Sequence, residues 1–387
     1  MEEERNVKHL GQVFTPENIV DLMLNLRRNK GSVLEPSCGS GAFSDKIPGC
    51  VAIEYDKNVA PSYAKVMDFF DYGEENKFDT IIGNPPYVRY KDIPPDTKSK
   101  LNMSIFDERS NLYLFFIEKC IRQLNPRGEL IFIVPREIMK STAAARLNER
   151  LYSEGTITDF MDLSDKKIFQ DAAPDTVIFR FEKGNFKREM KDGRTFSVIN
   201  GQMIFSKEKY TVPFSELFFV KVGAVSGADR IFTSQNGNVE FVCSATKTTG
   251  NLKRMYYNTP APDLLKHKNE LLARKIKKFD EHTWYMWGRG YYESDEERLY
   301  VNAKTRQSAP FFYNQCKAYD GSVLAIFPKF KADKELLLKV ANELNAVDWT
   351  ELGFKGGGRF LFSQRALENT VLPEAFEKYK GLLSKKA

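Results

Sequence analysis

The sequence predicts an α/β protein with a doubly wound, mostly parallel sheet, followed by a second domain of mixed α+β structure. In residues 1–183, short apolar runs alternate with helical stretches, which is typical of a parallel sheet covered by helices on both faces. After about residue 184 the chain becomes polar and glycine-punctuated, and then richer in aromatic and basic residues. We therefore predict one domain over residues 1–183 and a second over residues 184–387.

The expected elements of the first domain follow from these runs. Apolar stretches predict strands over residues 32–36, 51–56, 66–70, 79–83, 129–135, 157–163 and 176–181. Helices are expected over residues 16–28, 111–124 and 136–153. In the second domain we expect a linker or hairpin first, strands over 218–225 and 239–242, and helices over 262–278 and 333–344.

Composition excludes several classes of protein. No stretch of the 387 residues approaches the length of a membrane span, and the charged start of the chain is unlike a signal peptide. Five scattered cysteines, with no C-x-x-C pair, predict reduced thiols and a cytoplasmic protein. Only three histidines are present, none at ligand spacing, so we expect no metal site. These patterns indicate an intracellular enzyme or binding protein without a metal site.

The ends of the first three predicted strands carry residues suited to a nucleoside cofactor. The first strand leads into the small-residue loop 35–43, EPSCGSGAF, which lets a ligand approach the backbone closely. The second carries Glu54 near its end, placed to accept from a ribose diol, and the third carries Asp68 and Phe69 near its end, at the height of an adenine. The loop is not G-x-G-x-x-G and lacks lysine, so S-adenosylmethionine fits better than a phosphate-bearing cofactor.

The fourth predicted strand stops at Asn84-Pro85-Pro86-Tyr87. Two successive prolines forbid both strand and helix, and Pro86 restricts Pro85 to an extended conformation that fixes its carbonyl. The Asn84 side chain and the Pro85 carbonyl can accept both hydrogens of an exocyclic amine, and Tyr87 can stack on its ring. We predict a rigid double-acceptor clamp, with catalysis by orientation and electrostatics rather than by a strong base.

The motifs occur along the chain in the same order as in a known family of enzymes. The segments QVFTP (12–16), VLEPSCGSGAF (33–43), IEYD (53–56), MDFF (67–70) and IIGNPPY (81–87) resemble the γ-class, TaqI-like N6-adenine DNA methyltransferases of restriction-modification systems. The likeness is close over about residues 10–183 and looser beyond. It implies a class I methyltransferase fold, S-adenosylmethionine as cofactor, and a catalytic turn at Asn84, Pro85, Pro86 and Tyr87. The cofactor residues that it implies are Phe14, Thr15, Glu35, Cys38, Glu54, Asp68 and Phe69, with Asn84 and Pro85 at the edge of the site.

The resemblance also implies how the target base is held. An adenine inside duplex DNA cannot reach the turn, so it must flip out and stack between two walls. Tyr87 is the expected first wall, and Phe169, in the segment KIFQD (167–171), is the candidate for the second. Ordinary core packing is the alternative reading for Phe169.

The second half of the chain suits a nucleic-acid partner. Residues 183–306 hold 22 Lys and Arg against 14 Asp and Glu, a net +8, whereas the remainder holds 36 against 38. Basic residues alternate with aromatic ones there, which suits phosphate and base contacts, although a small-domain core explains the aromatic cluster 284–292 equally well. Our candidates for DNA contact are Arg254, Lys275, Lys277, Arg289 and Arg359.

We therefore expect a monomeric, sequence-specific DNA adenine methyltransferase that protects host DNA, acting alone or beside a restriction endonuclease on a separate chain. Asn-Pro-Pro-Tyr also occurs in enzymes that methylate protein glutamine amides, and related turns occur in RNA methyltransferases. A methyltransferase for RNA or protein is therefore the alternative. The DNA sequence that is recognised does not follow from the motifs.

Overall fold

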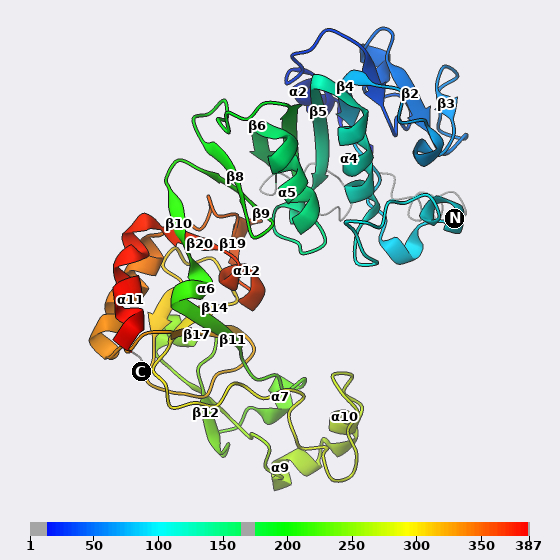
Figure 1. Cartoon of the computed structure of the whole chain (residues 1–387). Coiled ribbons are helices and arrows are strands. Elements are labelled where there is room, and N and C mark those ends of the chain that lie inside the picture. Colours follow the sequence, from blue (N-terminus) through cyan, green and yellow to red (C-terminus); the bar gives the residue numbers. More distant parts are fainter. Residues whose placement is uncertain (1–13, 164–174, 386–387) are drawn as a thin grey trace. The chain divides into compact units, whose positions relative to one another are not determined.

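The computed structural model describes residues 14–163 and 175–385 of the chain. It contains two compact units (Figure 1). The first comprises Met1–Lys207 together with Glu351–Gly358, and the second comprises Glu208–Thr350 with Arg359–Ala387.

A seven-stranded sheet of order β3-β2-β1-β4-β5-β7-β6 forms the centre of the first unit. The pairs β1–β2, β1–β4, β2–β3 and β4–β5 are parallel, whereas β7 runs antiparallel to both β5 and β6. The strands are β1 (Val33–Glu35), β2 (Val51–Glu54), β3 (Lys65–Val66), β4 (Phe78–Gly83), β5 (Leu124–Pro135), β6 (Gly155–Asp162) and β7 (Thr176–Lys183). This arrangement confirms the predicted doubly wound, mostly parallel fold.

Helices cover both faces of this sheet. Neighbouring residues of one strand point to opposite faces, so Ile81 packs in the core that contains α4 and α5, and Ile82 packs in the core that contains α2. The helices are α2 (Glu17–Leu24), α3 (Pro95–Lys98), α4 (Leu112–Gln123) and α5 (Ala145–Glu154). Short 3₁₀ turns lie at Ser44–Lys46, Phe69–Asp71, Tyr90–Asp92 and Arg136–Met139. The hairpin β8 (Thr195–Ile199) and β9 (Gln202–Ser206) and the short β18 (Lys355–Gly356) complete the unit.

A buried carboxylate ties the middle of the sheet together. Glu129 on β5 is fully buried and forms an ion pair with Arg180 of β7, with Oε2 and Nε 2.7 Å apart. Its Oε1 accepts from the hydroxyl of Thr80 on β4 at 2.9 Å, and from the backbone N–H groups of Arg28 and Asn29, also at 2.9 Å. One side chain therefore joins three strands to the loop after α2, and it leaves the Arg180 charge paired within the core.

The second unit has mixed α+β structure, as the sequence predicts. Its main sheet has the order β11-β17-β14-β16, with antiparallel neighbours. The strands of the unit are β10 (Tyr210–Pro213), β11 (Phe218–Val222), β12 (Val239–Phe241), β13 (Lys253–Met255), β14 (Leu299–Asn302), β15 (Lys304–Thr305), β16 (Phe311–Tyr313), β17 (Val323–Pro328), β19 (Arg359–Leu361) and β20 (Val371–Pro373). Its helices are α6 (Phe214–Leu217), α7 (Asp229–Phe232), α8 (Thr246–Thr249), α9 (Pro262–Leu265), α10 (Lys268–Leu272), α11 (Lys334–Ala346) and α12 (Gln364–Glu368), followed by the 3₁₀ segment Glu374–Lys385.

Several predicted elements differ from the structure. The helix expected over 262–278 is two short helices, α9 and α10, after which residues 273–279 form a loop. The strand expected over 66–70 is only the short β3, which ends at Val66. A 3₁₀ turn follows at Phe69–Asp71, where the Asp68 side chain accepts a hydrogen bond from the backbone N–H of Phe70. The helix expected over 136–153 begins only at Ala145. Within the described residues, none of the helices has the length and apolar character needed to span a bilayer.

The boundary between the two units also differs from the predicted one at 183/184. The hairpin β8–β9 belongs to the first unit, which extends to Lys207. In addition, Glu351–Gly358, here called the return segment, joins the first unit although both its flanks belong to the second. Phe354 is buried in it, with the Lys140 ammonium 3.4 Å from the ring centroid, and the Arg136 guanidinium donates to the carbonyls of Gly353 and Lys355. No local sequence signal predicts this return, because it depends on contacts between residues far apart in the chain.

Candidate functional site

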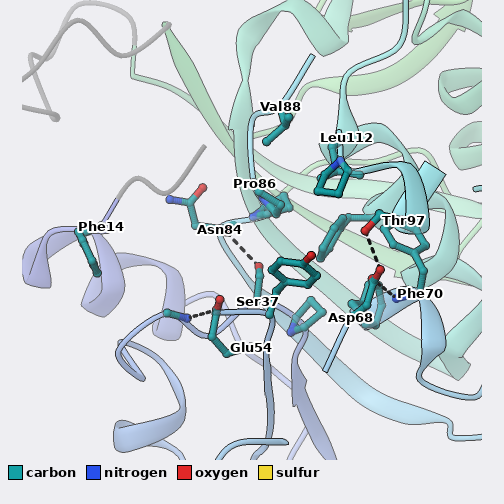
Figure 2. Close-up of a pocket in the computed structure, with 17 residues that line it drawn as sticks. Phe14, Ser37, Glu54, Asp68, Phe70, Asn84, Pro86, Val88, Thr97 and Leu112 are labelled. Carbon is teal, nitrogen blue, oxygen red and sulfur yellow. Dashed lines mark hydrogen bonds between the residues drawn. The ribbon is translucent and has the colours of Figure 1, made fainter. Parts of the chain in front are cut away.

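A cavity lies where β1, β2 and β4 end, at the carboxyl edge of the sheet, the edge at which α/β proteins of this kind bind ligands. Its lining comes from separate segments of the first unit (Figure 2). The lining residues are Phe14, Pro36, Ser37, Gly39, Glu54, Tyr55, Asp68, Phe69, Phe70, Asn84, Pro85, Pro86, Val88, Pro94, Thr97, Leu112 and Phe116. Most of these side chains are apolar, with a few polar groups placed among them, as in a small-molecule site.

The glycine-containing loop after β1 is held in place by Glu54 at the end of β2. The Glu54 carboxylate accepts from the backbone N–H of Gly39 at 2.8 Å and from that of Asp56 at 2.9 Å. Gly39 has φ +53° and Gly41 has φ +94°, a conformation that favours glycine. A Cβ on Gly41 would lie 2.4 Å from the Tyr63 hydroxyl oxygen, so a larger residue there would also require the Tyr63 side chain to shift.

At the end of the third strand, Asp68 and the aromatic residues after it form another part of the cavity. The Asp68 carboxylate caps the turn at Phe69–Asp71, with Oδ1 accepting from the Phe70 N–H at 2.9 Å. The ring of Phe69 stacks on Phe116 of α4, with centroids 4.9 Å apart. A flat apolar wall thus lies next to a carboxylate, which is suitable for a purine ring with an amine substituent.

The turn after β4 is fixed at both of its ends. The Ser37 hydroxyl donates to the backbone carbonyl of Asn84 at 3.2 Å, and the Asn84 Nδ2 donates to the Thr15 hydroxyl at 3.2 Å. The Nδ2 end of the amide group is therefore turned toward Thr15, and the acceptor Oδ1 is at the other end. The Tyr87 hydroxyl donates to the carbonyl of Ile133 on β5 at 3.0 Å, and its ring meets Tyr113 edge-on at 6.1 Å. Burial raises the pKa of Tyr87 well above its ordinary value, so its hydroxyl keeps its proton.

Most of the predicted cofactor residues meet at this cavity. Those that line it are Phe14, Glu54, Asp68, Phe69, Asn84 and Pro85. Thr15 contacts Asn84 instead, as described above. Glu35 is buried, and its carboxylate accepts from the Ser44 N–H at 2.7 Å; burial raises its pKa to about 8. Cys38 is also buried, with its thiol pKa raised to about 12 by burial. For Thr15, Glu35 and Cys38, direct contact with a cofactor stays a prediction.

The remaining predicted residues are Phe169 and the DNA-contact candidates of the second unit. Phe169 lies outside the described residues, so its role as a second wall stays a prediction. In the second unit, Lys275, Lys277 and Arg289 are exposed. Arg254 forms an exposed ion pair with Glu240, with the two atoms 2.7 Å apart, and Arg359 begins β19.

Sequence reasoning missed the part of the wall that follows the Asn84–Tyr87 turn. Val88, Pro94 and Thr97 line the cavity from the stretch between the turn and α4. Leu112 and Phe116 line it from α4 itself. A run of apolar residues along α4 is visible in the sequence, but nothing in it distinguishes the residues that face a cavity from those that face the core. Thr97 is the polar member of this wall, and its hydroxyl donates to Asp68 Oδ2 at 2.7 Å.

The fold and the site together define a class of protein. The strand order β3-β2-β1-β4-β5-β7-β6 with β7 antiparallel is the class I methyltransferase fold. Its cavity lies at the ends of the strands, with acids after β2 and β3 and the Asn-Pro-Pro-Tyr turn after β4. The predicted fold class is thereby confirmed.

Comparison with known proteins agrees with this class. Residues 45–169 match the family described as Eco57I restriction-modification methylase. The type II methyltransferase M.HincII of Haemophilus influenzae is 33% identical over 198 residues, covering 48% of this chain and 39% of the relative. The type II methyltransferase M.TthHB8I of Thermus thermophilus is 31% identical over 216 residues, covering 49% of this chain and 50% of the relative. The chain therefore spans half or less of the length of these two curated relatives.

Among solved structures, the type IIG restriction endonuclease BpuSI has a TM-score of 0.42 at 13% identity, covering 98% of this chain and 61% of that one. The sequence matches confirm the resemblance to restriction-modification methylases that the motifs predict.

Proposed function

We propose that this protein transfers a methyl group from S-adenosylmethionine to the N6 amine of a flipped-out adenine in DNA, as part of a restriction-modification system. One observation carries the proposal most directly. The rigid turn Asn84-Pro85-Pro86-Tyr87 follows β4 and lines the same cavity as Glu54 and Asp68 through its first three residues. A nucleoside-binding cavity and a pair of fixed amine acceptors thus share one site. The type II methyltransferases among the relatives support DNA as the substrate.

The residues of the cavity fit S-adenosylmethionine. Glu54 is placed for the ribose hydroxyls, Asp68 for the adenine amine, and the Phe69–Phe116 wall for the ring, while Gly39 lets the ligand lie close to the backbone. The bound cofactor supplies an electrophilic methyl group. No lysine or arginine is among the described residues that line the cavity, which agrees with a ligand that has no phosphates.

The turn supplies the groups that act on the target amine. The lone pair of an adenine amine is delocalised into the ring, so the nitrogen is a poor nucleophile. Asn84 Oδ1 and the Pro85 carbonyl accept its two hydrogens and favour a pyramidal nitrogen, whose positive charge grows as the new bond forms. Both acceptors are fixed before the reaction, so they stabilise the transition state with little reorganisation. Tyr87 offers a face for the base, and we assign Phe169 to the opposite face.

The substrate can be tested directly. Full-length protein is incubated with methyl-labelled S-adenosylmethionine and either duplex DNA, structured RNA or a mixture of translation factors. We expect label in duplex DNA alone, recovered as N6-methyladenine after digestion to nucleosides. Label in RNA or in a glutamine side chain would replace the DNA proposal with the alternative function, and label in another DNA base would refute the adenine assignment.

The role of Glu54 gives a first prediction. Glu54→Ala should weaken the binding of S-adenosylhomocysteine by about 1–3 kcal/mol, because the ribose hydroxyls lose a charged acceptor and the Gly39 loop loses its support. Isothermal titration calorimetry measures this change. Glu54→Gln is the matched control: it keeps the shape and one acceptor, so its loss should be smaller. Equal affinity of wild type and Glu54→Ala would remove Glu54 from the site.

The second unit contains a basic loop suited to DNA phosphates. Lys275, Lys277 and Lys278 are exposed on the loop after α10. Within the described part of the chain, none of the three forms an ion pair, whereas the nearby cations Arg230 and Lys268 are paired with Glu270 and Glu281. Unpaired cations keep their full charge available for a phosphate.

The loop is held rigidly by the residue that precedes these lysines. Arg274 is buried, and its guanidinium donates to the carbonyls of Leu271, Ser226, Trp284 and Met286 at 2.5–2.9 Å. Burial lowers its pKa to about 10. Ile276 packs on Gly227 and Gly288, where a Cβ would come within 2.3 Å and 2.4 Å of the isoleucine side chain. Arg274 is thus an anchor of the second unit rather than a DNA contact, and Trp284 and Trp287 are likewise part of its core.

A triple variant tests this loop. Changing Lys275, Lys277 and Lys278 to alanine should reduce the slope of log affinity against log salt concentration by about 2–3, since each phosphate contact contributes about 0.9. The control changes Lys329, Lys331 and Lys334 to alanine, three exposed lysines of the same unit with the same total charge. Fluorescence anisotropy with labelled duplex DNA at several salt concentrations measures both. Equal slopes for the two triple variants would exclude the loop as a phosphate contact.

A further inference from the structure

The Asp68 carboxylate is held by three donors of the protein. Oδ1 accepts from the Phe70 N–H at 2.9 Å. Oδ2 accepts from the Thr97 hydroxyl at 2.7 Å and from the Lys100 ammonium at 3.3 Å. Since a carboxylate accepts about four hydrogen bonds, these donors leave room for one more from a ligand.

The two donors to Oδ2 differ in how firmly they hold it. Lys100 is a partly exposed side chain that is shared with Asp71, whose Oδ2 lies closer, at 2.6 Å. Thr97 is only 5% exposed and sits on the short helix α3, between Pro94, which also lines the cavity, and the buried Leu101. Figure 2 shows the Thr97–Asp68 bond at the side of the cavity away from Asn84. The threonine is therefore the fixed contact, whereas the lysine is an adjustable one.

We propose that Thr97 is a positioning residue that sets the base selectivity of the cofactor site, by holding the Asp68 carboxylate toward the exocyclic amine of the bound adenine. The torsion that rotates a carboxylate about its Cβ–Cγ bond is soft. Without the Thr97 hydroxyl, Oδ2 would be held by the adjustable Lys100 alone, and the carboxylate could turn further about its contact with the Phe70 N–H. With the hydroxyl in place, one lone pair remains directed at a ligand N–H. Such a site accepts an amine and repels a carbonyl oxygen at the same position.

This inference rests on the proposed function, because it takes S-adenosylmethionine as the ligand. It is tested with two probes that differ at the 6-position of the purine and at the adjacent N1. S-adenosylhomocysteine carries the amine and an unprotonated N1, whereas S-inosylhomocysteine carries a carbonyl and an N1–H. Calorimetric titration gives the affinity of the full-length chain for each. The readout is the ratio of the two dissociation constants, which a general loosening of the fold would not change.

Thr97→Val keeps the shape of the side chain and removes the hydroxyl. We expect it to weaken S-adenosylhomocysteine binding about tenfold, the lower end for a hydrogen bond to a charged group, with less than about a threefold change for the inosine compound. Thr97→Ser should restore the wild-type ratio. Ser99→Ala is the matched control, since the Ser99 hydroxyl follows the same helix but donates to the Asp96 carbonyl at 2.7 Å, and it should leave the ratio unchanged.

The outcomes separate this inference from the proposed function. A wild-type chain that binds S-adenosylhomocysteine, together with a Thr97→Val variant whose ratio is unchanged, overturns the positioning role of Thr97 and leaves the methyltransferase proposal standing. Equal weakening of both probes in Thr97→Val also overturns the positioning role, because the effect is then structural. A wild-type chain that binds neither probe overturns the proposed function and this inference with it.

Discussion

Replacing Asn84 with alanine should lower the rate of methyl transfer to DNA by at least about a hundred- to a thousandfold, the effect of removing one preorganised group from a transition state. The substitution removes Oδ1, the acceptor that gains most as positive charge develops on the target amine. Affinity for the cofactor should change little, because Glu54, Asp68 and the Phe69–Phe116 wall remain. Affinity for DNA should also be kept, since the basic loop lies in the second unit.

The chemical step should be isolated by rapid-quench single turnover with labelled cofactor and saturating DNA. Ser37→Ala is the matched control. It removes a hydrogen bond to the backbone of Asn84 in the same cavity but leaves the side-chain amide in place. Its rate should stay within about tenfold of wild type, the scale of one ordinary hydrogen bond. A single-turnover rate for Asn84→Ala as high as that of Ser37→Ala would refute the double-acceptor mechanism.

Glu129→Ala should destabilise the first unit by about 3–5 kcal/mol, the usual consequence of removing one partner from a buried ion pair. The Arg180 charge would stay buried without its carboxylate, and the hydroxyl of Thr80 and the N–H groups of Arg28 and Asn29 would lose their acceptor. Urea unfolding followed by circular dichroism measures the loss. Tryptophan fluorescence should be much less affected, because Trp284, Trp287 and Trp349 all belong to the second unit.

Glu182→Ala provides the comparison for this experiment. Glu182 also faces Arg180, at 3.3 Å, but its side chain is 32% exposed, so its removal should cost less than about 1 kcal/mol. If the two substitutions shift the circular dichroism transition equally, Glu129 does not have the central role that its contacts indicate.

The sequence predicts the first unit well because its features are local. Each strand and the motif at its end lie within about ten residues, so apolar runs give the strands, and the Pro85-Pro86 pair gives the turn without any distant contact. Parallel strands bring their carboxyl ends to one edge, and this rule alone places Glu54, Asp68 and Asn84 at one cavity.

Features that depend on distant contacts were not predictable in this way. Thr97 gains its role only because α3 lies against Asp68, and the sequence between the turn and α4 gives no sign of this. Lys275 and Lys277 looked like part of a helix, but the buried Arg274 side chain binds carbonyls from three segments and holds residues 273–279 as a loop. Tertiary contacts of this kind override helix propensity.

The return segment bears on how the second unit could be exchanged between related proteins by recombination. A single crossover after Lys207 would replace the whole second unit, but it would also import a foreign version of residues 351–358. The foreign segment would bring different side chains into contact with Arg136 and Lys140. In this chain Arg136 donates to the Gly353 carbonyl and Lys140 lies over the Phe354 ring. A working hybrid therefore needs either parents that agree at these positions or two further junctions, near 350/351 and 358/359. The two units alternate along the chain, so recombination between distant relatives should produce a poorly folded first unit more often than a single boundary would suggest.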